Sequence, residues 1–234
     1  MITGDLMETF KNALKEKNME LTVQQEKQFR QYYETLIEWN QKMNLTSITE
    51  EKEVYFKHFL DSISLRDVLD KTSGNILDVG SGAGFPSIPL KIMNPDIKVT
   101  IVDSTLKRTH FLEHLTKQLQ IKDVEIIHAR IEDFKQKDFF DVVTARAVAS
   151  LPILMEWCAP FVKIDGYFIA MKGPKADDEI LAASNAQKVL GLSLQQRHTY
   201  PLLENYRELI VYQKKTKSPK QYPRPLAKIK KHPL

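Results

Sequence analysis

The hydrophobic residues of this chain follow one pattern before residue 75 and another after it. From residue 75 onward, short apolar runs alternate with longer amphipathic stretches, as buried parallel strands and surface helices do. This alternation predicts helices between the first six strands, and strands near 75–79, 98–102, 124–128, 140–145, 166–171, 192–199 and 206–213. We expect a hairpin to join the last two strands. The pattern is typical of an α/β fold whose seven-stranded, mostly parallel sheet has helices on both faces.

The N-terminal part of the chain is helical in pattern and shows no strand-like alternation. Leu6, Phe10 and Leu14 form one apolar stripe, and Thr22 with Gln25 forms a capping box at the start of the next helix. The helical period breaks over residues 40–48 and then resumes. We therefore predict an N-terminal helical extension over residues 1–70, a core over residues 71–213 and a tail over residues 214–234.

A glycine-punctuated turn follows the first predicted strand, and a helix follows that turn. Its pattern is Asp78-x-Gly80-x-Gly82-x-Gly84, with glycines that permit a sharp turn and a close approach to a ligand. A dinucleotide-binding fingerprint would need glycine at position 85, where Phe85 stands. The loop instead resembles the first motif of class I S-adenosyl-L-methionine-dependent methyltransferases, which have a Rossmann-like core. The alternative is a tight β-to-α turn without a ligand.

Three further positions would complete such a cofactor site. Asp103 ends the second strand, where this fold places a ribose-binding carboxylate, although it could also cap the helix that begins near Ser104. Ile131 and Glu132 follow the third strand, where they would lie beside an adenine ring; acids at a helix start are the alternative. Arg146 ends the fourth strand and would meet a methionine carboxylate or a substrate phosphate, unless it belongs to a structural ion pair.

Composition narrows the class of protein. The 234 residues are 42% hydrophobic and 27% charged, and they include no apolar run of membrane-spanning length. The absence of such a run predicts no membrane association. Because Cys158 is the only cysteine, no disulfide framework can form, and we expect a cytoplasmic protein. His110 and His114 match a zinc-binding pattern, but no third ligand is evident, so we predict no metal. Cys158 has no basic neighbour and is expected to serve packing.

The net charge of +4 is unevenly distributed. No acid follows Glu208, whereas eight basic residues do, so the preceding part of the chain carries a net charge of −4. A basic tail on a slightly acidic body suggests a polyanionic partner such as nucleic acid. The alternative is a solvated tail that only aids solubility. We expect removal of the tail to weaken RNA binding and to leave cofactor affinity almost unchanged.

Several motifs together are similar to those of the bacterial 16S ribosomal RNA (guanine-N(7))-methyltransferase G family, also called glucose-inhibited division protein B. They span nearly the whole chain: Asn44-Leu-Thr, His58-Phe-Leu-Asp-Ser62, the loop from Asp78, Asp103-Ser with Lys107-Arg108, Ala129-Arg130 with Glu132, Thr144-Ala-Arg-Ala147, Lys172-Gly173 and Tyr222-Pro-Arg224. The chain departs from the family after Arg224, where Pro225-Leu-Ala-Lys replaces the usual Lys, Gly and Thr-Pro-rich ending.

The resemblance implies methylation at N7 of a guanine in the decoding-region loop of 16S rRNA, guanine 527 in rRNA numbering. The cofactor would be S-adenosyl-L-methionine and the partner 16S rRNA or the small ribosomal subunit, with the protein as a monomer. Cofactor contacts are implied at Gly80, Phe85, Ile131, Glu132 and Arg146. The substrate-side, catalytic positions are Asn44, His58 and Arg130.

The implied reaction needs no general base, because N7 of guanine already has a free lone pair. His58 would then position the reactants or act electrostatically, unless it is simply a buried, hydrogen-bonded histidine. Three other functions remain open. A small-molecule methyltransferase does not explain the basic tail, and a non-catalytic ribosome-binding factor does not explain the intact glycine loop. A nicotinamide-dependent oxidoreductase is disfavoured by Phe85.

Overall fold

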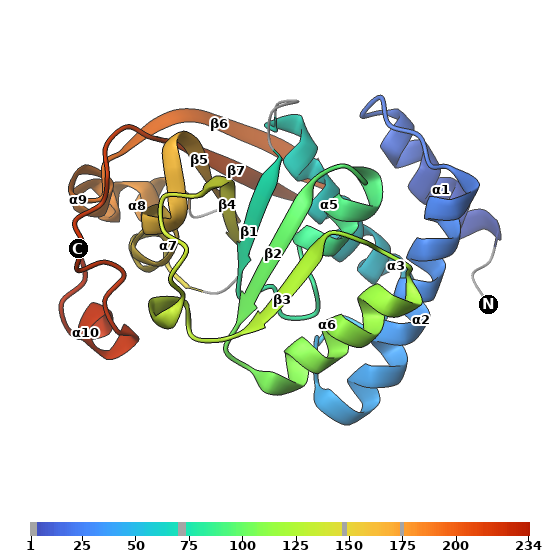
Figure 1. Cartoon of the computed structure of the whole chain (residues 1–234). Coiled ribbons are helices and arrows are strands. Elements are labelled where there is room, and N and C mark those ends of the chain that lie inside the picture. The colour runs from blue at the N-terminus through green and yellow to red at the C-terminus, as the bar shows by residue number, and fades with distance from the viewer. Residues whose placement is uncertain (1–3, 70–73, 147–148, 174–175) are drawn as a thin grey trace.

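The sheet is built as the hydrophobic pattern predicts. The computed structural model describes residues 4–69, 74–146, 149–173 and 176–234. Its seven strands lie in the order β3-β2-β1-β4-β5-β7-β6 (Figure 1). Their bounds are β1 Asn75–Val79, β2 Lys98–Asp103, β3 Val124–His128, β4 Phe140–Arg146, β5 Val162–Lys172, β6 Leu192–Leu202 and β7 Asn205–Lys214. The first five strands are parallel, whereas β7 runs antiparallel to both β5 and β6. The predicted fold class and the terminal hairpin are confirmed.

Helices cover both faces of this sheet (Figure 1). One face carries the N-terminal helices together with α5 Ser87–Met93 and α6 Leu106–Gln118, and the other carries α7 Leu151–Cys158, α8 Ala176–Ala182 and α9 Ser184–Val189. Apolar residues alternate along strands such as β1 and β4 between two buried clusters, one under each helical layer. Cys158 is fully buried in the second cluster, as expected for a packing residue.

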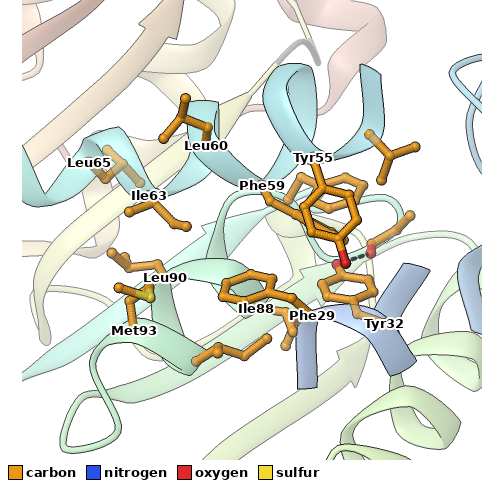
Figure 2. Packing of buried hydrophobic residues seen from close by; sticks show 14 of the residues in the cluster. Phe29, Tyr32, Tyr55, Phe59, Leu60, Ile63, Leu65, Ile88, Leu90 and Met93 are labelled. Carbon is orange, nitrogen blue, oxygen red and sulfur yellow. Dashed lines mark hydrogen bonds between the residues drawn. The ribbon is translucent and has the colours of Figure 1, made fainter. Parts of the chain in front are cut away.

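The N-terminal segment is helical, as predicted, and packs on the sheet through α5. Its elements are α1 Gly4–Lys15, α2 Val23–Met43, α3 Glu51–Glu53, a π-helix Val54–Leu60, α4 Asp61–Ile63 and a 3-10 turn Ser64–Asp67. Thr22 and Gln25 form the predicted capping box, and α2 ends at Asn44 in the left-handed conformation. Figure 2 shows the aromatic rings of this layer against α5, where Phe29, Tyr32, Tyr55 and Phe59 approach Ile88.

One predicted helix is absent from the described residues. The connection between β3 and β4 contains only a 3-10 turn, Ile131–Asp133, because Phe134 takes up an extended conformation directly after it. The Phe134 ring packs against Phe140 and Phe161 at centroid distances of 6.2 and 5.4 Å, which draws the chain across the end of the sheet. The helix after β2 begins at Leu106, two residues beyond the predicted start.

The basic tail is not a free chain. Lys214 is fully buried, and its ammonium group donates hydrogen bonds to the carbonyl oxygens of Ala159 and Leu190 and to the Ser218 hydroxyl. Burial lowers the pKa of Lys214 to about 8. A short helix, α10 Leu226–Lys231, closes the chain beside the sheet face that carries α7 (Figure 1). Arg224 is also ion-paired, with Glu156, and the exposed Lys217 ammonium group lies 3.7 Å from the Asp138 carboxylate.

Candidate active site

The glycine loop after β1 uses its glycines for two different purposes. Gly82 has φ +62°, and a Cβ added there would meet no atom within 4 Å, so this position faces open space. Gly84 has φ +97°, and a Cβ added there would lie 2.6 Å from the Tyr32 hydroxyl oxygen. That hydroxyl donates a hydrogen bond to the Ala83 carbonyl oxygen at 2.6 Å. Gly82 therefore leaves room for a ligand, while Gly84 lets the N-terminal extension hold the loop.

Asp103 joins the glycine loop to the second strand. Its Oδ2 accepts a hydrogen bond from the Gly82 amide at 3.2 Å, and its Oδ1 accepts one from the Thr105 amide at 2.8 Å. The Arg108 guanidinium lies 3.7 Å from the same carboxylate. The side chain is 2% exposed, and its residue lines the cavity beside the loop. Asp103 borders the ligand space, but it is not the helix cap that was its alternative role, because the N-cap of α6 is Thr105 and has no side-chain cap.

Asp78 lies behind the loop rather than beside the open space. Its side chain is fully buried, with Oδ2 accepting a hydrogen bond from the Ser87 amide at 3.1 Å at the start of α5. Oδ1 has no hydrogen-bond partner among the described residues, and burial raises the pKa of this carboxyl group to about 7. Asp78 is not among the residues that line the cavities around the loop. Its local effect is to tie β1 to α5.

Two neighbouring cavities open at the carboxyl ends of the parallel strands. The first, of about 390 Å³, contains the loop residues and lies between β1, β2 and the N-terminal extension. It is lined by Leu45, Thr46, His58, Gly80, Ser81, Gly82, Ala83, Phe85, Asp103, Ser104, Arg108 and Arg146. The second, of about 290 Å³, is lined by Val79, Gly80, Val102, Ser104, Ala129, Arg130, Ile131, Glu132, Trp157 and Leu226. Both include Gly80 and Ser104, so they lie side by side at the end of the glycine loop.

This pair of cavities fits S-adenosyl-L-methionine. The open space at Gly82 would allow the backbone to approach a ribose, and the Asp103 carboxylate would suit its hydroxyl groups. In the second cavity, Ile131 provides a buried apolar side chain and Glu132 a partly buried acid, which suit an adenine ring and its exocyclic amine. The predicted residues Gly80, Gly82, Phe85, Asp103, Ile131, Glu132 and Arg146 are thus brought together; Asp78 and Gly84 support the loop from behind.

Arg146 lies at the centre of a buried polar cluster. Its Nη1 donates hydrogen bonds to Asp61 Oδ2 at 2.8 Å and to the Lys57 carbonyl oxygen at 3.0 Å. Asp61 is fully buried and also accepts hydrogen bonds from the Tyr200 hydroxyl at 2.7 Å and from Arg207 Nε at 3.3 Å. Arg146 therefore has a structural ion pair, one of the alternatives considered. Sequence reasoning assigned no role to Asp61, although an acid that directly follows the apolar pair Phe59-Leu60 was a signal of burial with a partner.

His58 is held as a neutral imidazole. His58 Nδ1 lies 3.0 Å from Arg146 Nη2 and 3.2 Å from the Lys57 carbonyl oxygen. Because a guanidinium can only donate and lies closer, Nδ1 is the acceptor in the pair with Arg146. His58 Nε2 therefore carries the proton and donates to Thr46 Oγ1 at 2.9 Å. Burial, reinforced by the Arg146 charge, lowers the pKa of His58 to about 3. The ring stacks on Phe85 at a centroid distance of 4.4 Å, and the one nitrogen that could accept a proton, Nδ1, already accepts a hydrogen bond from Arg146.

A third cavity adjoins the same cluster on its outer side. It has a volume of about 380 Å³ and is lined by Ile48, Lys57, His58, Arg146, Leu202, Asn205, Tyr206 and Arg207. His58 and Arg146 are shared with the glycine-loop cavity, so these two side chains form the boundary between the two spaces. Of the other predicted substrate-side residues, Arg130 is exposed at the rim of the second cavity. Asn44 is exposed next to Leu45, and it lines none of these cavities.

The zinc pattern does not gather ligands. In the described part of the chain, no three histidine, cysteine, aspartate or glutamate side chains are placed to share a metal ion. His114 packs against the Trp39 ring at 5.0 Å, and His110 is exposed on α6. A search of the described helices also found none that is long and apolar enough to span a bilayer.

Comparisons with known proteins agree with this geometry. Among solved structures, the fold resembles magnesium protoporphyrin IX methyltransferase of Synechocystis PCC 6803 with bound S-adenosylmethionine (TM-score 0.58, 14% identity, 78% of this chain and 97% of that one). It also resembles an S-adenosylmethionine-dependent methyltransferase from Aquifex aeolicus (TM-score 0.56, 14% identity, 72% and 96%). The fold is thus that of the predicted enzyme class.

Sequence relatives identify the family. Ribosomal RNA small subunit methyltransferase G of Staphylococcus aureus strain bovine RF122 / ET3-1 is 50% identical, with 97% of this chain and 98% of that protein covered. The corresponding protein of strain Newman is 49% identical over the same shares. The family model GidB, described as rRNA small subunit methyltransferase G, matches residues 25–210. A methyltransferase family with this fold confirms the predicted cofactor, S-adenosyl-L-methionine. The chain belongs to the rRNA small subunit methyltransferase G family.

Proposed function

We propose that this protein methylates N7 of a guanine in the decoding-region loop of 16S rRNA, guanine 527 in rRNA numbering. Its partner would be 16S rRNA or the small ribosomal subunit, met by a monomer. The names of its relatives support small-subunit rRNA as the substrate. The chemistry of the site supports an acceptor atom that needs no deprotonation.

The observation that carries this proposal is the boundary formed by His58 and Arg146. These residues line both the glycine-loop cavity and the outer cavity, so a base in the outer cavity would meet the cofactor beside them. No carboxylate is among the described residues that line the outer cavity, and His58 is neutral with its Nδ1 already hydrogen-bonded. A site without a free proton acceptor suits N7, whose lone pair can attack directly.

S-adenosyl-L-methionine supplies an electrophilic methyl group on sulfur. When bound, it would give up this methyl group to N7, whose lone pair would form the new bond while the old bonding pair stayed on sulfur. One positive charge passes from sulfur to the base, so the net charge of the reacting pair is constant. The protein therefore contributes mainly by holding donor and acceptor in line, which can supply several kcal/mol of the barrier reduction.

Named residues would hold each reactant. Gly82 and Asp103 border the ribose, while Ile131 and Glu132 border the adenine. Arg146, fixed by Asp61, lines both cavities and would lie beside the cofactor's methionine part and the base. The Asp61–Arg146 pair also holds Arg146 Nη2 against His58 Nδ1, and the His58 ring stacks on Phe85.

The outer cavity has the side chains that an unstacked RNA base would need. Tyr206 is 66% exposed on the β6–β7 hairpin and offers an aromatic face for stacking. Lys57 and Arg207 place positive charge at the same opening, suited to the phosphates beside the target base. Exposed Arg130 and Asn44 would extend this contact on either side of the site.

Mass-spectrometric mapping of 16S rRNA from cells with and without this protein tests the function. We expect one 7-methylguanosine to be missing from the decoding-region loop of the deletion strain. Restoration by the wild-type gene, and not by an Arg146→Ala variant, would assign the activity to this site. An unchanged modification map would reject the proposal, and loss of a different methylated base would redirect it. Incubation of purified protein with naked 16S rRNA and with small subunits then identifies the substrate form.

A further inference from the structure

The C-terminal strap, defined as Tyr222–Leu226, contributes to the cavity that fits adenine. Leu226 lines this cavity together with Ile131 and Trp157, although it lies beyond the last strand in a segment that the sequence marks as a basic tail. The Leu226 side chain is partly buried, and so is that of Trp157. A tail that served only to bind RNA would not need to form part of this cavity.

The strap is fastened on one side to α7. Arg224 donates from Nε to Glu156 Oε1 and from Nη2 to Glu156 Oε2, each at 2.7 Å, and its backbone amide also donates to Oε1 at 3.1 Å. Glu156 is fully buried, so its carboxylate depends on Arg224 for a counter-charge. Trp157 directly follows Glu156, and Leu226 lies two residues after Arg224. One ion pair therefore sets the position of two neighbouring cavity walls.

On its other side, the strap is fastened to the connection between β3 and β4. Lys137 donates a hydrogen bond to the Tyr222 carbonyl oxygen at 2.5 Å, and Tyr222 itself is 6% exposed within the core cluster under α7. The connection that carries Lys137 also carries Ile131 and Glu132, which line the same cavity. The strap thus bridges the two segments between which the adenine ring would lie.

We propose that Leu226 is a cofactor-positioning residue that packs against the nucleoside end of S-adenosyl-L-methionine, and that the Arg224–Glu156 pair holds it there. This inference rests on the cofactor placement proposed above. It reverses the sequence-based expectation that loss of the tail would leave cofactor affinity almost unchanged. It also assigns a purpose to Pro225-Leu226, the point where the chain departs from the ending usual in its family.

Calorimetric titration of the full-length protein with S-adenosylhomocysteine tests the inference. Leu226→Ala removes the apolar contact and should weaken binding about fivefold, whereas Leu226→Met should restore it. 5′-Methylthioadenosine, which keeps the nucleoside and lacks the amino-acid part, should lose affinity by the same factor. The matched control is Leu181→Ala, because Leu181 is 76% exposed on α8 and lines none of these cavities. Its affinity should equal that of the wild type.

Arg224→Gln tests the fastening. We expect it to raise the dissociation constant of S-adenosylhomocysteine at least as much as Leu226→Ala, and to raise the KM for the cofactor with little change in kcat. Thermal melts without ligand show whether it still folds; if it does not, Leu226→Ala decides alone, because a partly exposed leucine is not needed for folding. Wild-type affinity of Leu226→Ala for both ligands would overturn the inference.

A Gly82→Val variant distinguishes a wrong role for the strap from a wrong placement of the cofactor. If Gly82→Val abolishes binding and Leu226→Ala does not weaken it, the cofactor lies at the loop and the strap is not part of its site. If Gly82→Val also binds normally, the cofactor placement itself is wrong.

Discussion

Replacing Asp61 by asparagine would remove the charge that holds the active-site cluster together. Asp61 is fully buried between Arg146, Arg207 and the Tyr200 hydroxyl. Asparagine has nearly the same shape, so packing is kept while the negative charge is removed. The Arg146 side chain is 9% exposed and would remain as a buried cation without its counter-ion. Breaking such a pair costs about 3–5 kcal/mol. We expect a loss of about 3 kcal/mol, since the more exposed Arg207 can turn to solvent.

Urea denaturation measures this loss as a decrease in the free energy of unfolding. A protein of ordinary stability has about 5–15 kcal/mol, so Asp61→Asn should stay folded in the absence of urea. Glu53→Gln is the matched control, because the Glu53–Lys57 pair lies one turn away with side chains that are 40% and 38% exposed. Such a pair contributes less than about 1 kcal/mol.

The folded variant should also lose activity. Arg146 would no longer be held against His58, and misplacement of groups at the boundary between donor and acceptor lowers the rate by about 10²-fold when it reaches 1 Å. Cofactor binding should change less, because the loop and Asp103 do not contact Asp61. If Asp61→Asn lost less than about 1 kcal/mol and kept wild-type activity, the charge of this carboxylate would not be what orders the site.

Three further variants test other parts of the structure. Gly84→Ala should lower the free energy of unfolding by about 2 kcal/mol or more, since its Cβ would lie 2.6 Å from the Tyr32 hydroxyl oxygen; a normal urea midpoint would contradict this. Burial raises the pKa of Asp78 to about 7 from its ordinary value of 3.8, so its contribution to stability is full below pH 3.8 and is lost as the pH rises through 7. Asp78→Asn should therefore gain stability relative to the wild type between pH 4 and 8, and melts showing a constant difference would refute the sign. The third variant replaces the exposed tail lysines by glutamine; these are Lys217, Lys220, Lys228, Lys230 and Lys231. It should bind RNA more weakly, and the slope of log affinity against log salt concentration should become shallower by about 0.7–0.9 for each phosphate that is no longer neutralised. A slope identical to that of the wild type would show that these lysines do not contact RNA.

Local patterns in the amino-acid sequence were enough to place the sheet and the loop around which the site is built. Apolar periodicity located all seven strands to within a few residues, and the capping box located the start of α2. Such signals are local: a strand, a cap or a glycine turn depends on a few neighbouring residues, whose conformational preferences are readable in order. Even so, the helix expected between β3 and β4 was wrong, because the packing of Phe134 against distant Phe161 outweighed the local pattern.

Which charges are free and which are buried became clear only in the folded chain. Asp61 finds its partners 85 and 146 residues away, and Glu156 finds Arg224 at a separation of 68 residues. Lys214 looked like the first residue of a solvated tail, yet it is fully buried against two carbonyl oxygens. A charged residue carries no local mark of its partner, because ion pairing is fixed by distance in space and by the desolvation that the fold imposes. For the same reason, only the fold could bring Leu226 from the tail to the cavity that the glycine loop predicted.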